Sequence, residues 1–297
     1  MKEREQTPLD ARAVRAVLRP LPADAGKEAR GRVLIVGGSL RYPGALLLAG
    51  RAAARCGAGV VTLATAHTVA ENLAGRDPNL TFQPLAEAAP GVITIAAAAQ
   101  VTTALRDKVR ALLIGPGLAH AAGTDDFIVA VLRNAGAVPT VVDADGLNAL
   151  ARTESWPAAL PAKTVLTPHD GEAARLAGRV VPTGTARIAF AERAARDWGA
   201  VVVLKGALTV VTDGKKTYVH DVPNAALGVG GSGDALAGAV AAFLARGLPP
   251  TAAAAVAVWT HGRAGALLVS ELGETGVLAT DIVDALPRAL REVIEAR

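Results

Sequence analysis

Cysteine is almost absent from this chain, which contains only Cys56. One cysteine cannot form an intrachain disulfide, and such scarcity is typical of proteins that work in a reducing compartment. Cys56 lies in an alanine-rich apolar helical pattern, where a thiol usually packs as a small hydrophobic side chain. We therefore interpret Cys56 as a structural residue, and we expect a cytoplasmic location.

Aromatic residues are also scarce, at 3% of the chain, whereas apolar residues make up 51%. The buried core is therefore expected to consist mostly of Ala, Val and Leu. No uninterrupted apolar stretch reaches the roughly 18 residues that a membrane-spanning helix requires. The charged N-terminus, MKEREQTPLDAR, also lacks the apolar core of a signal peptide. We expect no association with a membrane.

Neither sign of charge is in large excess, because 31 basic residues face 27 acidic ones and the net charge is +4. No run of Lys and Arg stands out, which argues against a nucleic-acid partner. A small anionic ligand is compatible with this balance. With 297 residues, of which 20% are charged, the chain is long enough and apolar enough to bury a large core.

Short apolar runs alternate with helical patterns along most of the chain, which favours an α/β fold. We expect strands at 32–36, 60–64, 111–114, 140–143, 164–166, 201–204, 209–212 and 217–220, with a weak one at 93–98. We expect helices at 7–19, 44–56, 100–109, 124–134, 170–177, 187–198, 234–246, 251–269 and 280–294. Several strands are apolar without alternation, which indicates a buried, mainly parallel sheet with helices on both faces.

Individual residues mark the expected boundaries of some elements. Thr7 and Pro8 suit the N-cap and the first position of the opening helix. Thr124 and Asp145 suit the N-caps of two later helices, of which the second is short. Asp213-Gly214 separates the last two strand-like runs and predicts a hairpin there.

The segment from Asn224 to Gly238, NAALGVGGSGDALAG, carries the clearest functional pattern. Four glycines crowd a loop in front of a helical pattern, and Asp234 lies in the first helical turn. Glycine lets a ligand approach the backbone closely, and the unpaired N–H groups of a helix start attract anions. The segment therefore predicts a phosphate site with Asp234 as a general base for a nearby hydroxyl. On spacing alone, Asp234 as a plain helix cap remains an alternative.

Two better-known phosphate motifs do not fit this segment. Gly228-x-Gly230-x-x-Gly233 matches the spacing of the dinucleotide fingerprint, but the following helix leads into further helices instead of a second strand. No acidic residue at a strand end follows about 20 residues later, as that fingerprint requires. A Walker loop needs a Lys-Ser/Thr pair, which the segment lacks. The interpretation that remains is a general anion site.

Polar residues and glycine turns also follow several of the expected strands. They are Gly37-Gly38-Ser39, Gly115-Pro116-Gly117, Asp143, Asp145, His169, Glu172 and Lys205. Each one alone has a structural explanation, such as a tight turn, a helix cap or a solvent-facing side chain. Ligands of parallel sheets bind outside the carboxyl ends of the strands. The accumulation of these residues at such ends therefore favours a functional site.

Taken together, these motifs resemble the ADP- or ATP-dependent NAD(P)H-hydrate dehydratases of the ribokinase-like superfamily. The resemblance covers nearly everything after about residue 27. It is carried in order by GRVLIVGGSLRYPGALLLAGRAAARCGAGVVTLAT (31–65), IGPGLA (114–119), VVDADGLNAL (141–150), VLTPHDGEAARLAG (165–178), VVLKGALTVV (202–211), GGSGDALAG (230–238) and WTHGRAGALLVSELGETGVLATDIVDALPRAL (259–290). It implies a ribokinase-like three-layer sandwich.

The resemblance implies a repair reaction on hydrated NADH or NADPH, acting on the S epimer. ADP or ATP would phosphorylate the C6 hydroxyl of the nicotinamide ring, and loss of phosphate would regenerate NAD(P)H. Asp234 matches the base that takes the hydroxyl proton, and Glu172 matches the acidic residue that orients Mg²⁺ through water. Two alternatives share the glycine loop: a small-molecule kinase for a vitamin precursor, and a non-catalytic nucleotide-binding protein.

Further roles follow from the same resemblance, residue by residue. The substrate would contact Tyr42, Ala45, Gly117, His169 and Asp234. The nucleotide would contact Lys205, Gly206, Ala207, Leu208, Thr209 and Gly233. The anion hole would consist of Gly230, Gly231, Ser232 and Gly233.

The chain departs from the family pattern at Val229, Ala225-Ala226 and Ala266, around the glycine loop and the last helices. We expect one domain over 1–297, with 1–27 as an N-terminal extension and without the epimerase domain that many relatives carry. The resemblance also implies a homotetramer.

Overall fold

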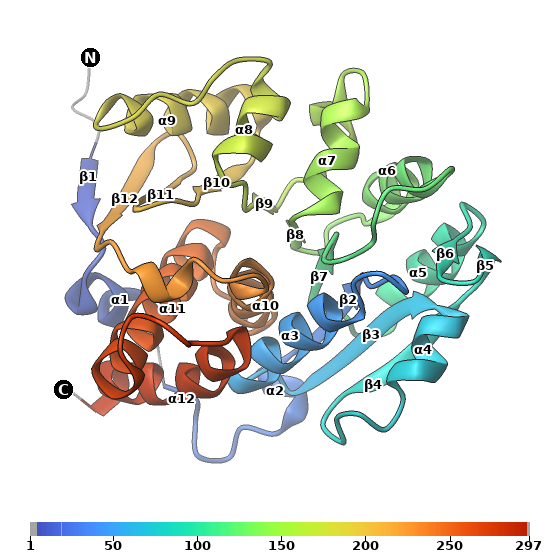
Figure 1. Ribbon diagram of the computed structural model, residues 1–297, viewed down its shortest axis with the longest axis horizontal. Helices are drawn as coiled ribbons and strands as arrows, with labels where there is room; N and C mark the ends of the chain where they lie inside the picture. Colours follow the sequence, from blue (N-terminus) through green and yellow to red (C-terminus); the bar gives the residue numbers. More distant parts are fainter. Residues whose placement is uncertain (1–4, 19, 296–297) are drawn as a thin grey trace.

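The computed structural model describes residues 5–18 and 20–295 and is built around one large sheet (Figure 1). Its ten strands lie in the order β1 (Glu5–Pro8), β12 (Lys216–Asp221), β11 (Leu208–Thr212), β10 (Val201–Leu204), β9 (Thr164–Leu166), β8 (Thr140–Val142), β7 (Ala111–Ile114), β2 (Arg32–Val36), β3 (Val60–Ala66) and β4 (Thr81–Leu85). Neighbouring strands are parallel except at β11, which is antiparallel to both β10 and β12. The predicted, mainly parallel sheet is confirmed.

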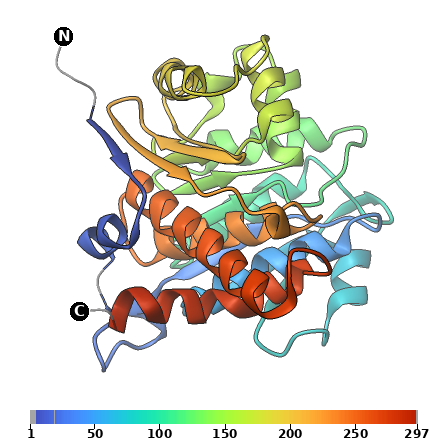
Figure 2. The same ribbon diagram turned by 60° about the vertical axis from the view of Figure 1, so that its left-hand side comes forward.

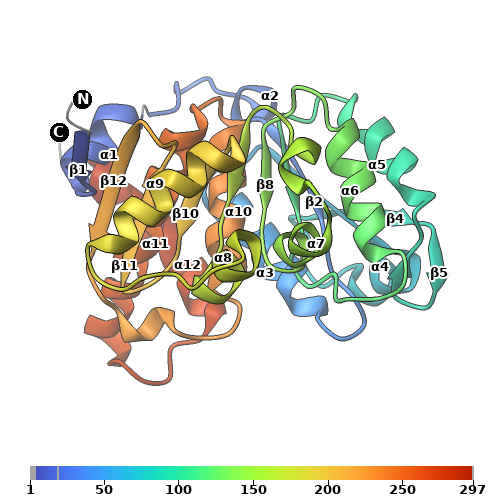
Figure 3. The same ribbon diagram turned by 90° about the horizontal axis from the view of Figure 1, so that it is seen from above.

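Helices cover both faces of this sheet (Figures 2 and 3). One face carries α3 (Pro43–Arg55), α10 (Ser232–Ala245) and α11 (Pro250–Leu272), with α12 (Ala279–Glu295) packed outside them. The other face carries α5 (Ala97–Leu105), α6 (Thr124–Asn134), α7 (Asp145–Arg152), α8 (Asp170–Ala177) and α9 (Ala186–Trp198). The central strands β7 to β10 are buried along their whole length, as the apolar runs without alternation predicted.

The order of the strands reverses once, at the boundary between β2 and β7. From β2 the chain moves outward through β3 to β4, then returns to β7 on the other side of β2 and continues to β10. The carboxyl ends of β2 and β7 therefore lie side by side, while their following connections lead in opposite directions. Sheets of this kind bind ligands at such a switch point. Gly37-Gly38 and Gly115-Pro116-Gly117 follow these two strands.

Among the described residues, only α11 is long and apolar enough to cross a membrane. In the structure it packs against α10, α12 and the strands β9 to β12, and 61% of its apolar window is buried inside the protein. Burial against the protein removes the apolar surface that a membrane would otherwise cover. Helix α11 is therefore a core helix of this fold.

The N-terminal segment corrects one prediction. We expected a helix over 7–19, but β1 occupies 5–8 and α1 (Ala11–Val17) follows; residue 19 lies outside the described residues. Thr7 is therefore a strand residue, and the N-cap is Asp10, whose Oδ1 accepts a hydrogen bond from the Ala13 N–H at 2.8 Å. Pro8 is compatible with β1 because an edge strand tolerates a missing N–H donor.

Two other expected caps are also wrong. The N-cap of α6 is Gly123, and Thr124 is its buried first residue. The N-cap of α7 is Ala144. Asp145 instead accepts a hydrogen bond from the Ala119 N–H at 2.8 Å, because the loop after β7 lies against the start of α7.

The predictions from the sequence were least accurate at the edge of the sheet beyond β3. Helix α4 (His67–Leu73) and strand β4 were not predicted, and β4 is a partly exposed edge strand that contains Pro84. The weak strand at 93–98 reduces to β6 (Val92–Ile93), paired with β5 (Glu87–Ala89). The alanines after it belong to α5, which begins at Ala97, because alanine favours helix.

Helices α3 and α10 pack closely enough for a stability test. A Cβ added at Gly238 of α10 would lie 2.1 Å from the Ala49 carbonyl oxygen of α3. Gly238→Ala is expected to lower the free energy of unfolding by about 2 kcal/mol because the two helices must separate. Gly44→Ala in α3 is the matched control, since nothing lies within 4 Å of an added Cβ there. Urea denaturation measures both, and equal stability would contradict the close packing.

Candidate active site

The glycine loop leads directly into α10, and Asp234 is the third residue of that helix. Gly231 is the N-cap with φ 93°, a left-handed conformation that suits glycine. Two of the first four helical N–H groups are bonded, from Ser232 to the Val229 carbonyl and from Ala235 to the Gly231 carbonyl. The other two N–H groups of this turn belong to Gly233 and Asp234, and they lie at the positive end of the helix dipole.

Asp234 lies in an environment that disfavours its charged form. Burial raises the pKa of Asp234 to about 7, the carboxylates of Asp143, Asp145 and Glu172 contribute to the rise, and Lys205 opposes it. A carboxyl group with a pKa near neutrality can take and release a proton at physiological pH. This property suits a general base. A residue that only caps a helix does not need it.

Lys205 lies among the acidic side chains at the carboxyl ends of β8, β9 and β10. Its Nζ donates a hydrogen bond to Asp143 Oδ1 at 3.0 Å and lies 3.9 Å from Glu172 Oε2. Asp143 is buried, and its Oδ1 also accepts a hydrogen bond from the Thr167 hydroxyl at 2.7 Å. Burial lowers the pKa of Lys205, but Asp143, Glu172 and Asp234 outweigh that effect and leave the pKa raised. Lys205 is therefore a fixed cation.

Lys205 also lies close to the glycine loop. A Cβ added at Gly233 would lie 3.3 Å from Lys205 Nζ. The first turn of α10 and the lysine therefore face the same small volume. The lack of a side chain at residue 233 lets the Lys205 ammonium approach the backbone of this turn closely.

His169 and Glu172 form the start of α8 as a reciprocal cap. His169 Nδ1 accepts hydrogen bonds from the N–H groups of Gly171 and Glu172, and Glu172 Oε2 accepts one from the His169 N–H at 2.9 Å. Because Nδ1 accepts, the neutral ring carries its proton on Nε2. Burial, Lys205 and Arg175 lower the pKa of His169, so this neutral form dominates at neutral pH.

Glu172 is buried beside Lys205. Burial raises the pKa of Glu172 to about 7; Lys205 opposes the rise and Asp143 adds to it. Asp143, Glu172 and Asp234 thus share one ammonium group, which neutralises them only in part.

Gly117 lies in the loop that follows β7 and packs against the start of α3. Its φ is +65°, and an added Cβ would lie 2.6 Å from the Tyr42 carbonyl oxygen and 2.9 Å from the Ala45 Cβ. Tyr42 is the N-cap of α3, and its side chain is 44% exposed. The structure thus brings together three of the residues that the sequence assigned to the substrate.

Asp145 lies close to both the loop of Gly117 and Asp234. The Asp145 carboxylate holds the Ala119 N–H, two residues after Gly117, and the same carboxylate contributes to the raised pKa of Asp234. Helix α10 packs on β2, β7 and β8, which places its first turn next to the carboxyl ends of these strands.

A cavity of about 770 Å³ lies beside the glycine loop. Its walls include the predicted nucleotide residues Lys205, Gly206, Ala207, Thr209 and Gly233, together with His169 and Ser232. Leu208 is not among its lining residues. Apolar residues such as Val222, Leu227 and Val258 complete the wall, and a cavity of this size accommodates a nucleotide.

Gly230 and Gly231, which we assigned to the anion hole, do not line this cavity, whereas Ser232 and Gly233 do. Gly230 is exposed. An added Cβ at Gly231 would meet the Leu48 side chain of α3 at 2.5 Å.

Arg187 holds the loop between β10 and β11, and sequence reasoning missed it. Its guanidinium donates hydrogen bonds to the carbonyl oxygens of Leu208 at 2.9 Å and Lys205 at 2.5 Å, and it pairs with Asp170. The residue is buried although it is charged. An arginine at the apolar start of α9 was the only local signal.

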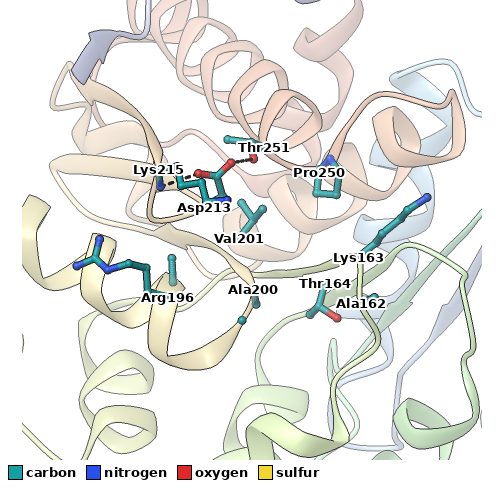
Figure 4. Close-up of a pocket in the computed structure, with 12 residues that line it drawn as sticks. Ala162, Lys163, Thr164, Arg196, Ala200, Val201, Asp213, Lys215, Pro250 and Thr251 are labelled. Atoms are coloured by element: carbon teal, nitrogen blue, oxygen red, sulfur yellow. Dashed lines mark hydrogen bonds between the residues drawn. The ribbon is translucent and has the colours of Figure 1, made fainter. Parts of the chain in front are cut away.

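A second cavity of about 550 Å³ lies at the amino ends of β9 and β10 (Figure 4). The carboxylate of Asp213 in its wall accepts a hydrogen bond from the Lys215 N–H at 2.9 Å and one from the Thr251 hydroxyl at 3.0 Å. Lys163 and Arg196 point their charged ends away from Asp213. Because none of the predicted site residues lines this cavity, it is separate from the candidate site.

Comparison with known structures first defines the class of protein. The chain superimposes on a ribokinase-like superfamily protein of Enterococcus faecalis with a TM-score of 0.81 and 26% identity, covering 97% of this chain and 96% of the other. It superimposes on the ADP/ATP-dependent NAD(P)H-hydrate dehydratase of Bacillus subtilis, co-crystallised with ATP and Mg²⁺, with a TM-score of 0.82 and 29% identity, covering 97% and 98%. The fold is ribokinase-like.

Sequence comparison then defines the family. The family described as NAD(P)H-hydrate dehydratase matches residues 33–288. The chain is 41% identical over 286 residues to the ADP-dependent (S)-NAD(P)H-hydrate dehydratase of Xanthomonas campestris, and the match covers 94% of each protein. It is 38% identical over 276 residues to the bifunctional NAD(P)H-hydrate repair enzyme of Moorella thermoacetica, covering 92% of this chain but only 52% of that relative.

This chain belongs to the NAD(P)H-hydrate dehydratase family, as its motifs predicted. It spans about half the length of the bifunctional relatives that it matches.

The contacts of Arg187 lead to a prediction about the nucleotide loop. Arg187→Leu is expected to lower the free energy of unfolding by about 2–3 kcal/mol, because it leaves carbonyl oxygens of the 204–208 loop without their donor. Arg193→Leu is the matched control, since Arg193 is exposed on the same helix. Chemical denaturation measures both variants. If Arg187→Leu were as stable as the control, the guanidinium would not hold the loop.

Proposed function

We propose that this chain catalyses the nucleotide-dependent dehydration of the S epimer of NADH or NADPH hydrate. The observation that carries the proposal is the position of Asp234, in the first turn of α10 and next to Lys205. The preceding residue, Gly233, lines the nucleotide-sized cavity together with Lys205, and Gly117 packs against Tyr42 and Ala45 at the start of α3. Support also comes from the 41% identity to an ADP-dependent (S)-NAD(P)H-hydrate dehydratase over nearly the full length of both chains.

The reaction requires a base beside the hydroxyl of the substrate. Asp234 takes the proton of the C6 hydroxyl, and the hydroxyl oxygen attacks the terminal phosphorus of ADP or ATP. The bond between that phosphorus and its bridging oxygen breaks, which releases AMP or ADP. The C6–O bond then breaks with its electron pair on phosphate, and loss of a ring proton from the adjacent carbon restores the double bond of NAD(P)H.

Phosphorylation is useful because hydroxide is a poor leaving group and phosphate is a good one. The backbone N–H groups of Gly233 and Asp234 and the ammonium of Lys205 would stabilise the negative charge on the transferring phosphoryl group. Lys205 is held in place by Asp143 at 3.0 Å, so little reorganisation is needed when the phosphate arrives. His169 and Gly117 would contact the nicotinamide side of the substrate.

The residues near Lys205 fit a Mg²⁺ ion that enters with the nucleotide. Asp143 and Glu172 offer carboxylate oxygens, the ligands that Mg²⁺ prefers. Among the described residues no group of three or more His, Cys, Asp or Glu side chains could hold a metal ion. As the family resemblance implies, Glu172 would hold the ion through water, and the phosphates of the nucleotide would supply further ligands. When bound, Mg²⁺ neutralises charge on the phosphates.

The remaining proposals rest on family resemblance. They are a single domain over 1–297, a homotetramer and a cytoplasmic location, with no nucleic-acid or membrane partner.

An absorbance assay tests the proposed function. The protein is incubated with hydrated NADH, Mg²⁺ and either ADP or ATP, and the reduced-nicotinamide band is followed. We expect the band to recover with at least one nucleotide, and Asp234→Asn to lower the rate by at least about 10²-fold while ADP binding persists. A stable phosphorylated product would favour a small-molecule kinase instead. No recovery with either nucleotide would reject the dehydratase.

The raised pKa of Asp234 predicts the pH dependence of the reaction. Because a base must be deprotonated, kcat/KM is expected to fall as the pH drops below about 7, the pKa of Asp234 in the free protein. Asp143→Asn removes a carboxylate that raises this pKa and frees Lys205 to face Asp234, so the acidic limb should shift to lower pH. A pH–rate profile of both proteins measures the shift, and an unchanged limb would contradict the assignment.

A further inference from the structure

The hydroxyl of Ser232 is in contact with a buried histidine that has no place in the reaction described above. Ser232 is the first residue of α10, and His261 lies in the middle of α11. His261 Nε2 is 3.0 Å from Ser232 Oγ and 3.1 Å from the Ser232 carbonyl oxygen. Both residues are buried, and both line the nucleotide cavity.

These two distances determine which nitrogen of His261 carries the proton. A carbonyl oxygen can only accept a hydrogen bond, so a nitrogen 3.1 Å away must act as a donor. If Nε2 were unprotonated, it could accept from the hydroxyl, but its lone pair would face the lone pairs of the carbonyl. The arrangement that satisfies both contacts is an Nε2–H shared between Ser232 Oγ and the Ser232 carbonyl.

The ring is neutral in this arrangement. Burial lowers the pKa of His261 to about 4; the hydrogen bond with Ser232 opposes this effect, and Lys205 and His220 add to it. At neutral pH His261 therefore acts through the direction of its hydrogen bond and not through a charge.

The protonated Nε2 also decides the direction of the serine hydroxyl. Because Ser232 Oγ accepts from His261, its own hydrogen cannot point back at the ring. The side chain belongs to the wall of the cavity, beside Gly233 and Lys205. The hydroxyl is thereby available as a donor toward that side, where the phosphate of a nucleotide would lie.

We propose that His261 is a positioning residue that orients the Ser232 hydroxyl as a hydrogen-bond donor to the terminal phosphate of the bound nucleotide. The proposal rests on the proposed function only in taking a nucleoside diphosphate or triphosphate as the ligand. His261 touches no reacting atom and acts through Ser232. The hydroxyl would add a fourth donor to the N–H groups of Gly233 and Asp234 and the ammonium of Lys205.

The tautomer can be measured directly on the wild-type protein. Nitrogen-15 NMR of the histidine rings distinguishes protonated from unprotonated Nε2 without substrate or turnover. We expect His261 to carry its proton on Nε2 at pH 7, and His261→Gln identifies the signal by its loss. A proton on Nδ1 alone would overturn the proposal, whatever the enzymatic activity.

Nucleotide binding then tests the consequence. Ser232→Ala and His261→Asn are each expected to weaken ADP binding about 10-fold, the effect of one lost hydrogen bond to a charged group, with adenosine binding unchanged. His261→Gln should retain most of the affinity, because its amide N–H lies near the place of Nε2, whereas that of Asn does not. Thermal unfolding checks that each variant is folded.

The double variant separates positioning from general damage. Ser232→Ala/His261→Asn is expected to bind ADP as Ser232→Ala does, because the histidine acts only through the hydroxyl. Additive losses, or an equal loss of adenosine affinity, would overturn the proposal. Absence of ADP binding to the wild type would reject the nucleotide site itself, and with it the proposed function. ADP affinity unchanged by Ser232→Ala would overturn this inference even if the wild type is an active dehydratase, whereas an inactive wild type that shows the expected binding losses would reject only the proposed function.

Discussion

One ammonium group shared among three carboxylates is the interaction on which this site depends. Lys205 is bonded to buried Asp143 and lies near Glu172, while Asp234 is close enough to influence its pKa. Partial or complete burial disfavours the charged forms of these carboxylates, and a single positive charge cannot neutralise all three, so part of the cluster shifts its pKa toward neutrality. Asp234 and Glu172 consequently have pKa values of about 7. The removal of this cluster from water is therefore the main reason why Asp234 can act as a proton acceptor at physiological pH.

The parallel sheet makes this cluster possible. Asp143, Thr167 and Lys205 follow β8, β9 and β10, which are neighbours in the sheet and run in the same direction. Their side chains therefore meet at the carboxyl ends of these strands, although more than sixty positions separate Asp143 from Lys205 in the sequence. Helix α10 adds Asp234 and its N–H groups from the face of the sheet, and close packing at Gly238 against α3 fixes its position.

Most of the residues of this site could be identified from the sequence. The apolar strands, the glycine loop and the polar residues after strand ends gave the fold class and the family, because these signals are local and periodic. Local patterns were less reliable where an element is half exposed, as in β4, and where a polar residue had two possible partners. Thr7 and Asp145 fit helix caps by position, but one lies in an edge strand and the other binds the Ala119 N–H.

By itself, the sequence determined the parallel α/β architecture, the membership of the family and the identity of Asp234 as the candidate base. Only the tertiary structure decided how Arg187 holds the nucleotide loop, how His261 faces Ser232, and why the pKa of Asp234 is raised. The reason is physical. Burial and charge–charge interaction depend on distances between residues that are far apart in the chain, and only packing fixes those distances.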